Sequence, residues 1–506
     1  MTRHVFQAAA ALCWLTLSFA PSRGDAAELL AGVARVDITD RAAGPVHDPC
    51  FAKALVLKSA ETTAVVITVD AVAIGELGRI TNSFLPNVRK RLQADLGIAP
   101  AGVVANASHC HGVVRTDTED LVVQAVREAY GKLVPVHVAT GLGREDRISE
   151  NRRLQLKDGS TVDMRRAYSM PRDEDVASVG PIDPQIGVVR IDRLDGKPLA
   201  VVYQFACHPI MNPPSLGNSA DYPSVASKII EENLGDGAVA FFLQGCGGDI
   251  NPVRYKEVNQ PADAEPLGNL LGLAVLRAVR PLETKPDGVL KVSSDSITVP
   301  AGADLQSRIT AIEAEQKQLL AALKPTNIDF KTFVPLLIEQ RLSPEFPSHY
   351  SQSYLHDRAL GKPDLDKLDA ANRAGVETYL QNIRVMERLT RLNTNLALLK
   401  KHQARTSAAA QSGLEVEVCG LRIGDFKLVT FPGELTVEVG LGIKKQAGDV
   451  HAHVSGYTNG YIYYAPTAEQ RKNPGYAQED CDSLVAPEWQ RIFELKSLAV
   501  LKRLAE

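Results

Sequence analysis

The stretch Gly187-Val-Val-Arg-Ile-Asp-Arg-Leu-Asp-Gly-Lys-Pro-Leu-Ala-Val-Val-Tyr-Gln-Phe-Ala-Cys-His-Pro209 contains two apolar runs separated by an Asp-Gly turn. The runs at 187–192 and 199–206 have the length and the β-branched content of strands, and Asp195-Gly196 is a typical hairpin turn. We therefore predict two antiparallel strands. His208 follows directly after the second strand, where the chain turns into a proline.

Strand-like and helical runs alternate through the first 300 residues. We predict further strands at 63–70, 103–107 and 239–243, and helices at 80–96, 119–133, 224–234 and 266–279. Such alternation favours an α/β core, and the hairpin makes the sheet mixed. The predicted fold class is α/β, with a layered mixed β-sheet core flanked by helices and a helical insert.

The insert is marked by a change of composition near residue 301. Residues 305–323 are rich in Ala, Glu, Gln and Leu, and a second helical stretch covers 365–402. We interpret 301–410 as a helical insert or cap, acting either as a lid or as a packing element. The core, begun at 27–300, resumes at 411–506 with strands at 414–423 and 426–430, a hairpin at Gly424-Asp425, and a last helix at 484–504.

Composition and the first residues bear on partners and location. The chain has 506 residues and a net charge of -4. Because there is no basic excess, we expect no nucleic-acid partner. A weakly basic start, an apolar run at 8–20 and small residues near Ala26 indicate a signal peptide at 1–26, with a buried N-terminal helix as the alternative. The signal peptide implies a secreted or periplasmic protein.

Six of the seven cysteines follow the expected signal peptide, and an even number in an oxidising compartment permits disulfides. There is no Cys-x-x-Cys pair, which argues against a structural zinc site or a thioredoxin-like motif. Cys110 and Cys207 each adjoin a histidine of interest, and they are the pair for which we consider a disulfide.

Two histidine motifs come at the ends of predicted strands. In Asn106-Ala-Ser-His-Cys-His-Gly112, His109 and His111 share one face of an extended strand. They either bind a metal or form a packed, hydrogen-bonded pair. His208 alone would more often be a core histidine. Carboxyl ends of strands line the binding crevice of open α/β sheets, so two such sites favour a metal.

Two further motifs carry polar groups. Gln244-Gly-Cys-Gly-Gly-Asp-Ile-Asn-Pro252 is glycine-rich but lacks the spacing of nucleotide-binding loops, so we interpret it as a substrate-lining turn. Phe431-Pro-Gly-Glu434 and the aromatic cluster Tyr457–Tyr464 follow. Glu434 is either a carboxylate ligand or a surface residue, and the tyrosines are packing residues, weak ligands or oxyanion donors.

Together and in this order, the four motifs resemble the neutral/alkaline non-lysosomal ceramidase family. The segments 31–39, 48–55, 68–70 and 219–223 also resemble that family's pattern. The likeness covers roughly residues 30–300 and 410–480, which correspond to its N-terminal catalytic domain. We expect no counterpart of the family's C-terminal β-sandwich, and the resemblance does not clearly cover the helical insert.

The resemblance implies an exported amidohydrolase that cleaves the N-acyl amide of a ceramide-like lipid with metal-activated water. One Zn2+ would be held by the residues that match the family's ligands, namely His109, His208, Glu434 and Tyr464. His111 would carry a proton or donate a hydrogen bond. Tyr476 and Arg152 would stabilise the carbonyl oxygen, with Arg153 as the alternative match to Arg152.

One position departs from the family in a way that limits the mechanism. Asn251 stands where ceramidases carry a serine; it cannot be a hydroxyl nucleophile, but it can orient water or bind an amide. The expected partner is a lipid-like N-acyl substrate, with transient membrane-surface contact through 301–410. The alternatives are a metal-dependent hydrolase of another N-acyl or ester substrate, and a non-catalytic secreted ligand-binding protein.

Overall fold

The computed structural model describes residues 28–60, 62–163, 171–212, 215–255, 261–326, 356, 358–362, 364–409, 413–473 and 477–506. The predicted signal peptide therefore lies outside the described residues. Within them, the largest sheet has eight strands in the order β12-β11-β10-β5-β1-β2-β3-β4. These are β1 (Leu29–Asp37), β2 (Phe51–Ser59), β3 (Thr62–Val69), β4 (Val103–Ala107), β5 (Val134–Arg144), β10 (Gln185–Arg193), β11 (Pro198–Phe205) and β12 (Val239–Gln244).

The predicted hairpin is confirmed, because β10 and β11 pair antiparallel around the Asp195-Gly196 turn. The sheet is mixed, since β11 pairs parallel with β12 and β3 pairs parallel with β4. Four helices cover one face of this sheet with apolar side chains. They are α1 (Phe84–Leu96), α2 (Thr118–Gly131), α3 (Asp221–Leu234) and α4 (Glu265–Val279).

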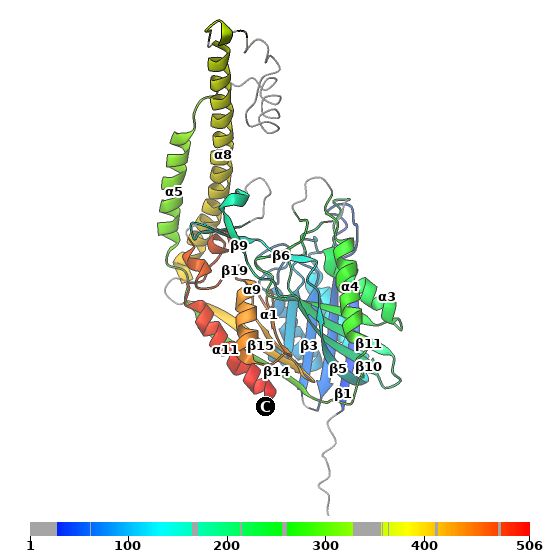
Figure 1. Cartoon of the computed structure of the whole chain (residues 1–506). Coiled ribbons are helices and arrows are strands. Elements are labelled where there is room, and N and C mark those ends of the chain that lie inside the picture. Colours follow the sequence, from blue (N-terminus) through cyan, green and yellow to red (C-terminus); the bar gives the residue numbers. More distant parts are fainter. Residues whose placement is uncertain are drawn as a thin grey trace, which may run out of the picture.

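The other face of the large sheet packs against a second sheet of four described strands, in the order β14-β15-β16-β18. Its members are β14 (Leu290–Val299), β15 (Leu414–Ile423), β16 (Phe426–Thr430) and β18 (Ala452–Ser455). Helices α9 (Val437–Ala447) and α11 (Trp489–Ala505) close its outer face. The layers are therefore helix, sheet, sheet and helix (Figure 1). The predicted α/β fold class is confirmed, with two stacked sheets where one was expected.

The helical insert leaves the second sheet and returns to it at one place. Strand β14 precedes it and β15 follows it, and these two strands pair along their whole length, from Leu290 with Ile423 to Val299 with Leu414. Helices α5 (Leu305–Ala322) and α8 (Asp364–Ala409) pack together and project away from the sheets (Figure 1). The role of 301–410 as lid or packing element stays a prediction.

Short elements complete the described part. They are β6 (Ser149–Asn151), β7 (Arg153–Leu156), β8 (Thr161–Asp163), β9 (Val176–Val179), β13 (Ile250–Pro252), β17 (Glu434–Leu435), β19 (Tyr464–Ala465) and α10 (Gln478–Cys481). The last helix starts at Trp489 and not at Leu484, because Val485 bridges Ala301 as extended chain. Among the described helices, none combines the length and the apolar character needed to cross a bilayer.

Candidate metal centre

Contact between the two edges of the large sheet brings the histidine motifs together. Strands β4 and β12 are last and first in the sheet order, yet they lie in contact. Asn106 of β4 joins the edges: its Oδ1 accepts from the backbone N–H of Gln244 at 2.9 Å, and its Nδ2 donates to Gly456 at 3.0 Å. The chain just after β4 therefore meets the chain just after β11.

Three predicted ligands converge at this point. His109 follows β4, His208 follows β11, and Glu434 begins β17. The nearest ligand atoms of these three side chains all lie within 4.8 Å of one another. Glu434 Oε2 is 3.0 Å from His208 Nε2 and 3.5 Å from His109 Nε2. All three side chains are almost wholly buried.

Backbone carbonyls fix the orientation of both imidazoles. His109 Nδ1 is 2.6 Å from the Val72 carbonyl oxygen, and His208 Nδ1 is 2.5 Å from that of Gly247. Since a carbonyl oxygen only accepts, each Nδ1 carries the proton and each Nε2 presents a lone pair. This is the tautomer that a metal-ligating histidine requires. His109 also has a backbone φ of 68°, a left-handed conformation that is uncommon for residues other than glycine and clusters at functional sites.

Charge completes the case for a cation. Burial, and next the charge of Arg152, lowers the pKa of His208, and burial lowers the pKa of His109 to about 4. The pKa of Glu434 lies well below its usual range although burial alone would raise it, so this carboxylate is ionised at neutral pH. At neutral pH, three atoms with lone pairs and no proton thus face one another. Such close contact is repulsive unless a cation lies among them, and two imidazoles with a carboxylate suit zinc.

Two tyrosines that the sequence analysis did not assign hold the carboxylate of Glu434. Tyr457 donates from its hydroxyl to Oε2 at 3.2 Å, and Tyr461 donates to Oε1. Burial keeps the pKa of both phenols well above its ordinary value, so both remain donors. The aromatic cluster contained the signal, because a buried carboxylate needs donors as well as a metal.

Tyr464 reaches the cluster through strand pairing. Strands β17 and β19 are parallel, with Glu434 opposite Tyr464, and the Tyr464 ring stacks 6.5 Å from that of His208. Arg152 donates from Nη2 to the Tyr464 hydroxyl at 3.1 Å. This hydrogen bond fixes the position of the Tyr464 hydroxyl.

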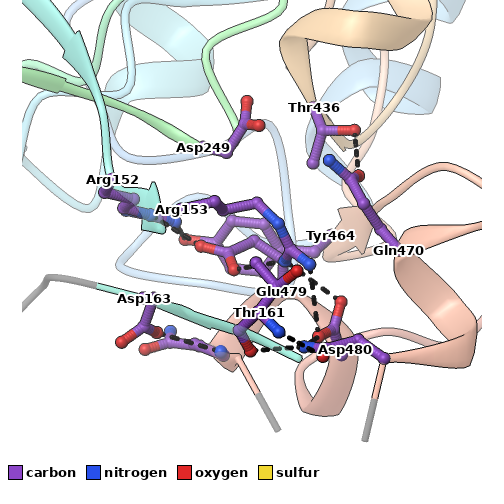
Figure 2. Close-up of polar contacts among 12 residues, drawn as sticks. Arg152, Arg153, Thr161, Asp163, Asp249, Thr436, Tyr464, Gln470, Glu479 and Asp480 are labelled. Atoms are coloured by element: carbon purple, nitrogen blue, oxygen red, sulfur yellow. Dashed lines mark hydrogen bonds and ion pairs between the residues drawn. The ribbon is translucent and has the colours of Figure 1, made fainter. Parts of the chain in front are cut away.

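Arg152 is buried inside a network of ion pairs (Figure 2). Its Nε donates to Glu479 at 2.6 Å, and Arg153 bonds both Glu479 and Asp480. Of the two arginines considered, Arg152 is the one that contacts a predicted ligand. Its guanidinium is largely occupied by protein groups, which suits positioning Tyr464 better than binding a substrate oxygen.

Asn251 lies beside the same guanidinium. Its Oδ1 accepts from Arg152 Nη1 at 3.2 Å, and its side chain is fully buried in β13. Its Nδ2 has no hydrogen-bond partner within the described residues. A buried amide N–H left over in this way is a candidate donor to a bound molecule.

His111 occupies the solvent-accessible side of the cluster, with its ring 5.6 Å from that of His109. Although exposed, it is closely surrounded by protein, which together with the adjacent His109 lowers its pKa to about 4. His111 borders a cavity of about 170 Å³ whose walls are mostly apolar, with Val72, Leu77, Ile80, Val113 and Val114. A larger polar cavity of about 480 Å³ borders Arg153 and Asp249 and contains none of the predicted ligands.

Two remaining expectations have different outcomes. Tyr476 lies outside the described residues. The six described cysteines are all free thiols, and the considered pairing of Cys110 with Cys207 is wrong for this structure. Cys110 belongs to the apolar cluster beneath α1 and α2, whereas Cys207 belongs to that beneath α3 and α4.

Comparison with known proteins supports the fold. No family model and no curated protein matches the chain. Among solved structures, it is similar to neutral ceramidase from Pseudomonas aeruginosa, with 17% identity, a TM-score of 0.58, and coverage of 95% of this chain and 75% of the other. A ceramidase complexed with C2 matches with 17% identity, a TM-score of 0.57, and coverage of 94% and 76%. The predicted resemblance is thus confirmed at the level of the fold.

Proposed function

We propose that the chain is a zinc-dependent amidohydrolase that cleaves the N-acyl amide bond of a ceramide-like lipid. The observation that carries this proposal is the convergence of His109 Nε2, His208 Nε2 and Glu434 Oε2, three unprotonated atoms, at one buried point. The shared fold with neutral ceramidase supports the reaction class. Tyr464, held by Arg152, is the proposed fourth ligand.

A zinc ion bound there would supply Lewis acidity and lower the pKa of a water molecule towards about 7. The protein's own part is to hold the ligands in one protonation state. Burial keeps both imidazoles neutral, the carbonyl contacts place their single proton on Nδ1, and two phenol donors orient the Glu434 carboxylate. The two imidazoles and the carboxylate are therefore held in place by other protein groups, which favours binding of a dication.

His111 is the proposed proton carrier for the leaving amine. It is the one histidine of the cluster with solvent access, and the ion pairs of Glu434 within the described residues are with His109 and His208 instead. A lowered pKa makes it neutral at rest, so it would accept a proton from the attacking water and then release it to the amine nitrogen.

Asn251 is the proposed donor to the substrate amide. Its Nδ2 is buried without a described partner, while Arg152 fixes the other end of the same amide group. A donor held in this way can bind a carbonyl oxygen without losing conformational freedom. A serine-type nucleophile is excluded at this position.

The apolar cavity beside His111 favours a substrate with a hydrocarbon chain. Its lining of valine, leucine and isoleucine gains from burying methylene groups, at roughly 0.8 kcal/mol for each. We place one chain of the lipid there, with the amide bond over the metal cluster. Transient membrane contact through α5 and α8 belongs to the same proposal, because such a substrate resides in membranes. Export is also part of the proposal, on the basis of the predicted signal peptide.

The test is hydrolysis of a fluorogenic ceramide, a short N-acyl amide and the matching ester by the purified chain. We expect amide turnover that a chelator abolishes and that added zinc restores. His109→Ala should lose both metal and turnover, while His451→Ala, a histidine outside the cluster, should retain both. Turnover of only the ester, or ligand binding without any turnover, would instead support one of the two alternatives and reject the ceramidase assignment.

A further inference from the structure

The thiols of Cys50 and Cys110 lie against each other beneath the loop that carries the histidines. Both side chains belong to the apolar cluster under α1 and α2, and the neighbouring Cys110 thiol raises the pKa of Cys50. A Cβ on Gly112 would come within 2.5 Å of Cys50 Sγ. Both residues are wholly buried. Two segments about 60 residues apart thus meet through sulfur, directly beside His109.

The backbone holds both cysteines in place. The N–H of Cys50 donates to Thr39 Oγ1 at 2.9 Å, and its carbonyl accepts from Ile38 at 2.9 Å. In the segment of Cys110, the backbone N–H of His109 donates to the Ala71 carbonyl at 3.0 Å. Because separate anchors fix the two segments, the sulfurs are kept adjacent by the fold itself.

The other described cysteines are placed elsewhere. Cys207, Cys246 and Cys481 belong to three different apolar clusters, and Cys419 bonds the side chain of Glu417. Among the described cysteines, Cys50 and Cys110 are therefore the two that share an apolar cluster and interact with each other.

We propose that Cys50 and Cys110 form a disulfide that ties the loop carrying His109 to the start of β2. The bond forms by exchange with a low-molecular-weight or protein disulfide: the two thiols lose two electrons and two protons, and the partner disulfide is reduced to two thiols. The resulting crosslink closes a long loop, which stabilises a fold mainly by restricting the unfolded chain.

The direct test is refolding of the denatured full chain in a buffer of reduced and oxidised glutathione, where every thiol is accessible. After alkylation of the remaining thiols and digestion without reductant, mass spectrometry should find the Cys50 and Cys110 peptides joined, with the mass of two hydrogens lost. Cys207 and Cys246 should be alkylated. Recovery of Cys50 and Cys110 both alkylated, or of Cys110 joined to Cys207, would overturn the proposal.

Variants separate this bond from a general effect of oxidation. The oxidised wild type should unfold at a higher temperature than the reduced protein, and Cys110→Ser should lose that difference. Cys207→Ser, the matched control, should keep it. Equal melting temperatures of the oxidised and reduced wild type would contradict the stabilising role. None of these measurements depends on metal or turnover, so they stand apart from the proposed hydrolase activity.

Discussion

Glu434 is oriented by two phenols before any metal arrives, since Tyr457 and Tyr461 each donate to one of its oxygens. Groups that orient a metal ligand typically contribute about 10- to 100-fold to metal affinity. We expect Tyr461→Phe to weaken zinc binding by about that factor, as measured by competition with a chromophoric chelator, because the carboxylate can then rotate.

Tyr463→Phe provides the matched control for that variant. The Tyr463 hydroxyl accepts from Arg405 at 2.7 Å and donates to Glu76, not to Glu434. Its zinc affinity should equal that of the wild type. If Tyr461→Phe and Tyr463→Phe bind zinc equally tightly, the orienting role of Tyr461 is rejected.

His111 and His109 are two residues apart but should behave differently. His111→Ala should keep the metal and lose about 10²- to 10⁴-fold in kcat, the usual contribution of a positioned acid or base. His109→Ala should lose the metal itself. Metal content by mass spectrometry and single-turnover rates measure the two effects, and full turnover by His111→Ala would remove it from the mechanism.

At this scale the sequence predicted which residues of the proposed ligand set come together better than it predicted the groups that hold them. His109, His208 and Glu434 stand in motifs whose order along the chain can be recognised, and the structure brings them together. Tyr457 and Tyr461 could not be assigned, because four tyrosines lie within eight residues and only the fold decides which hydroxyls meet the carboxylate.

The cavity formed by the chain after β3 and the loop after β4 should select substrate chain length. Leu77→Asp places a charge on its apolar wall. Burying a side chain of this size is worth about 1.5 to 3 kcal/mol, so we expect KM for a long-chain amide to rise by about 10- to 100-fold. KM for a short-chain amide should change little.

Leu194→Asp is the control, because Leu194 is exposed in the turn between β10 and β11. It should leave KM for both amides unchanged. An equal effect of Leu77→Asp on the long and the short amide would show that the cavity does not hold the hydrocarbon chain.

Strand β18 contains a titrating group that couples stability to pH. Burial, and next the charge of Lys444, lowers the pKa of His453 to about 3, and neither ring nitrogen has a described partner. The unfolded chain takes up this proton near pH 6.5 and the folded chain does not. Stability should therefore fall as the pH drops from 6.5 towards 3, by about 2 kcal/mol between pH 7 and pH 5 for this residue.

His453→Leu removes the buried imidazole. The free energy of unfolding of this variant should therefore change less between pH 7 and pH 5 than that of the wild type. Urea denaturation at pH 7 and pH 5, with a chelator present so that metal release does not contribute, measures both proteins. The remaining titrating groups are common to the two and cancel in the comparison. An identical pH dependence of wild type and variant would contradict the buried, neutral state of His453.

Elements with a strong local pattern could be predicted, and elements defined by distant partners could not. The hairpin at Asp195-Gly196 and helix α2 follow from turn residues and apolar spacing. Strands β1 and β5 were not predicted. They pair with each other although they lie far apart along the chain. Local sequence carries little information on such pairing.

The whole molecule assembles its site by stacking two sheets and bringing the edges of the larger one together. β4 meets β12 through Asn106, and the smaller sheet carries Glu434 on the chain that follows β16. No sequence pattern specifies this closure, which depends on contacts between residues more than one hundred positions apart. It is nevertheless what makes three separate motifs one site.

The account as a whole rests on a cation at that meeting point, and anomalous diffraction from crystals grown with zinc tests it directly. Data collected above and below the zinc absorption edge should give one strong difference peak bounded by His109 Nε2, His208 Nε2 and Glu434 Oε2, with the Tyr464 hydroxyl beside it. The same map from His109→Ala crystals should lack the peak. Wild-type crystals with no anomalous signal among these four side chains would contradict the account.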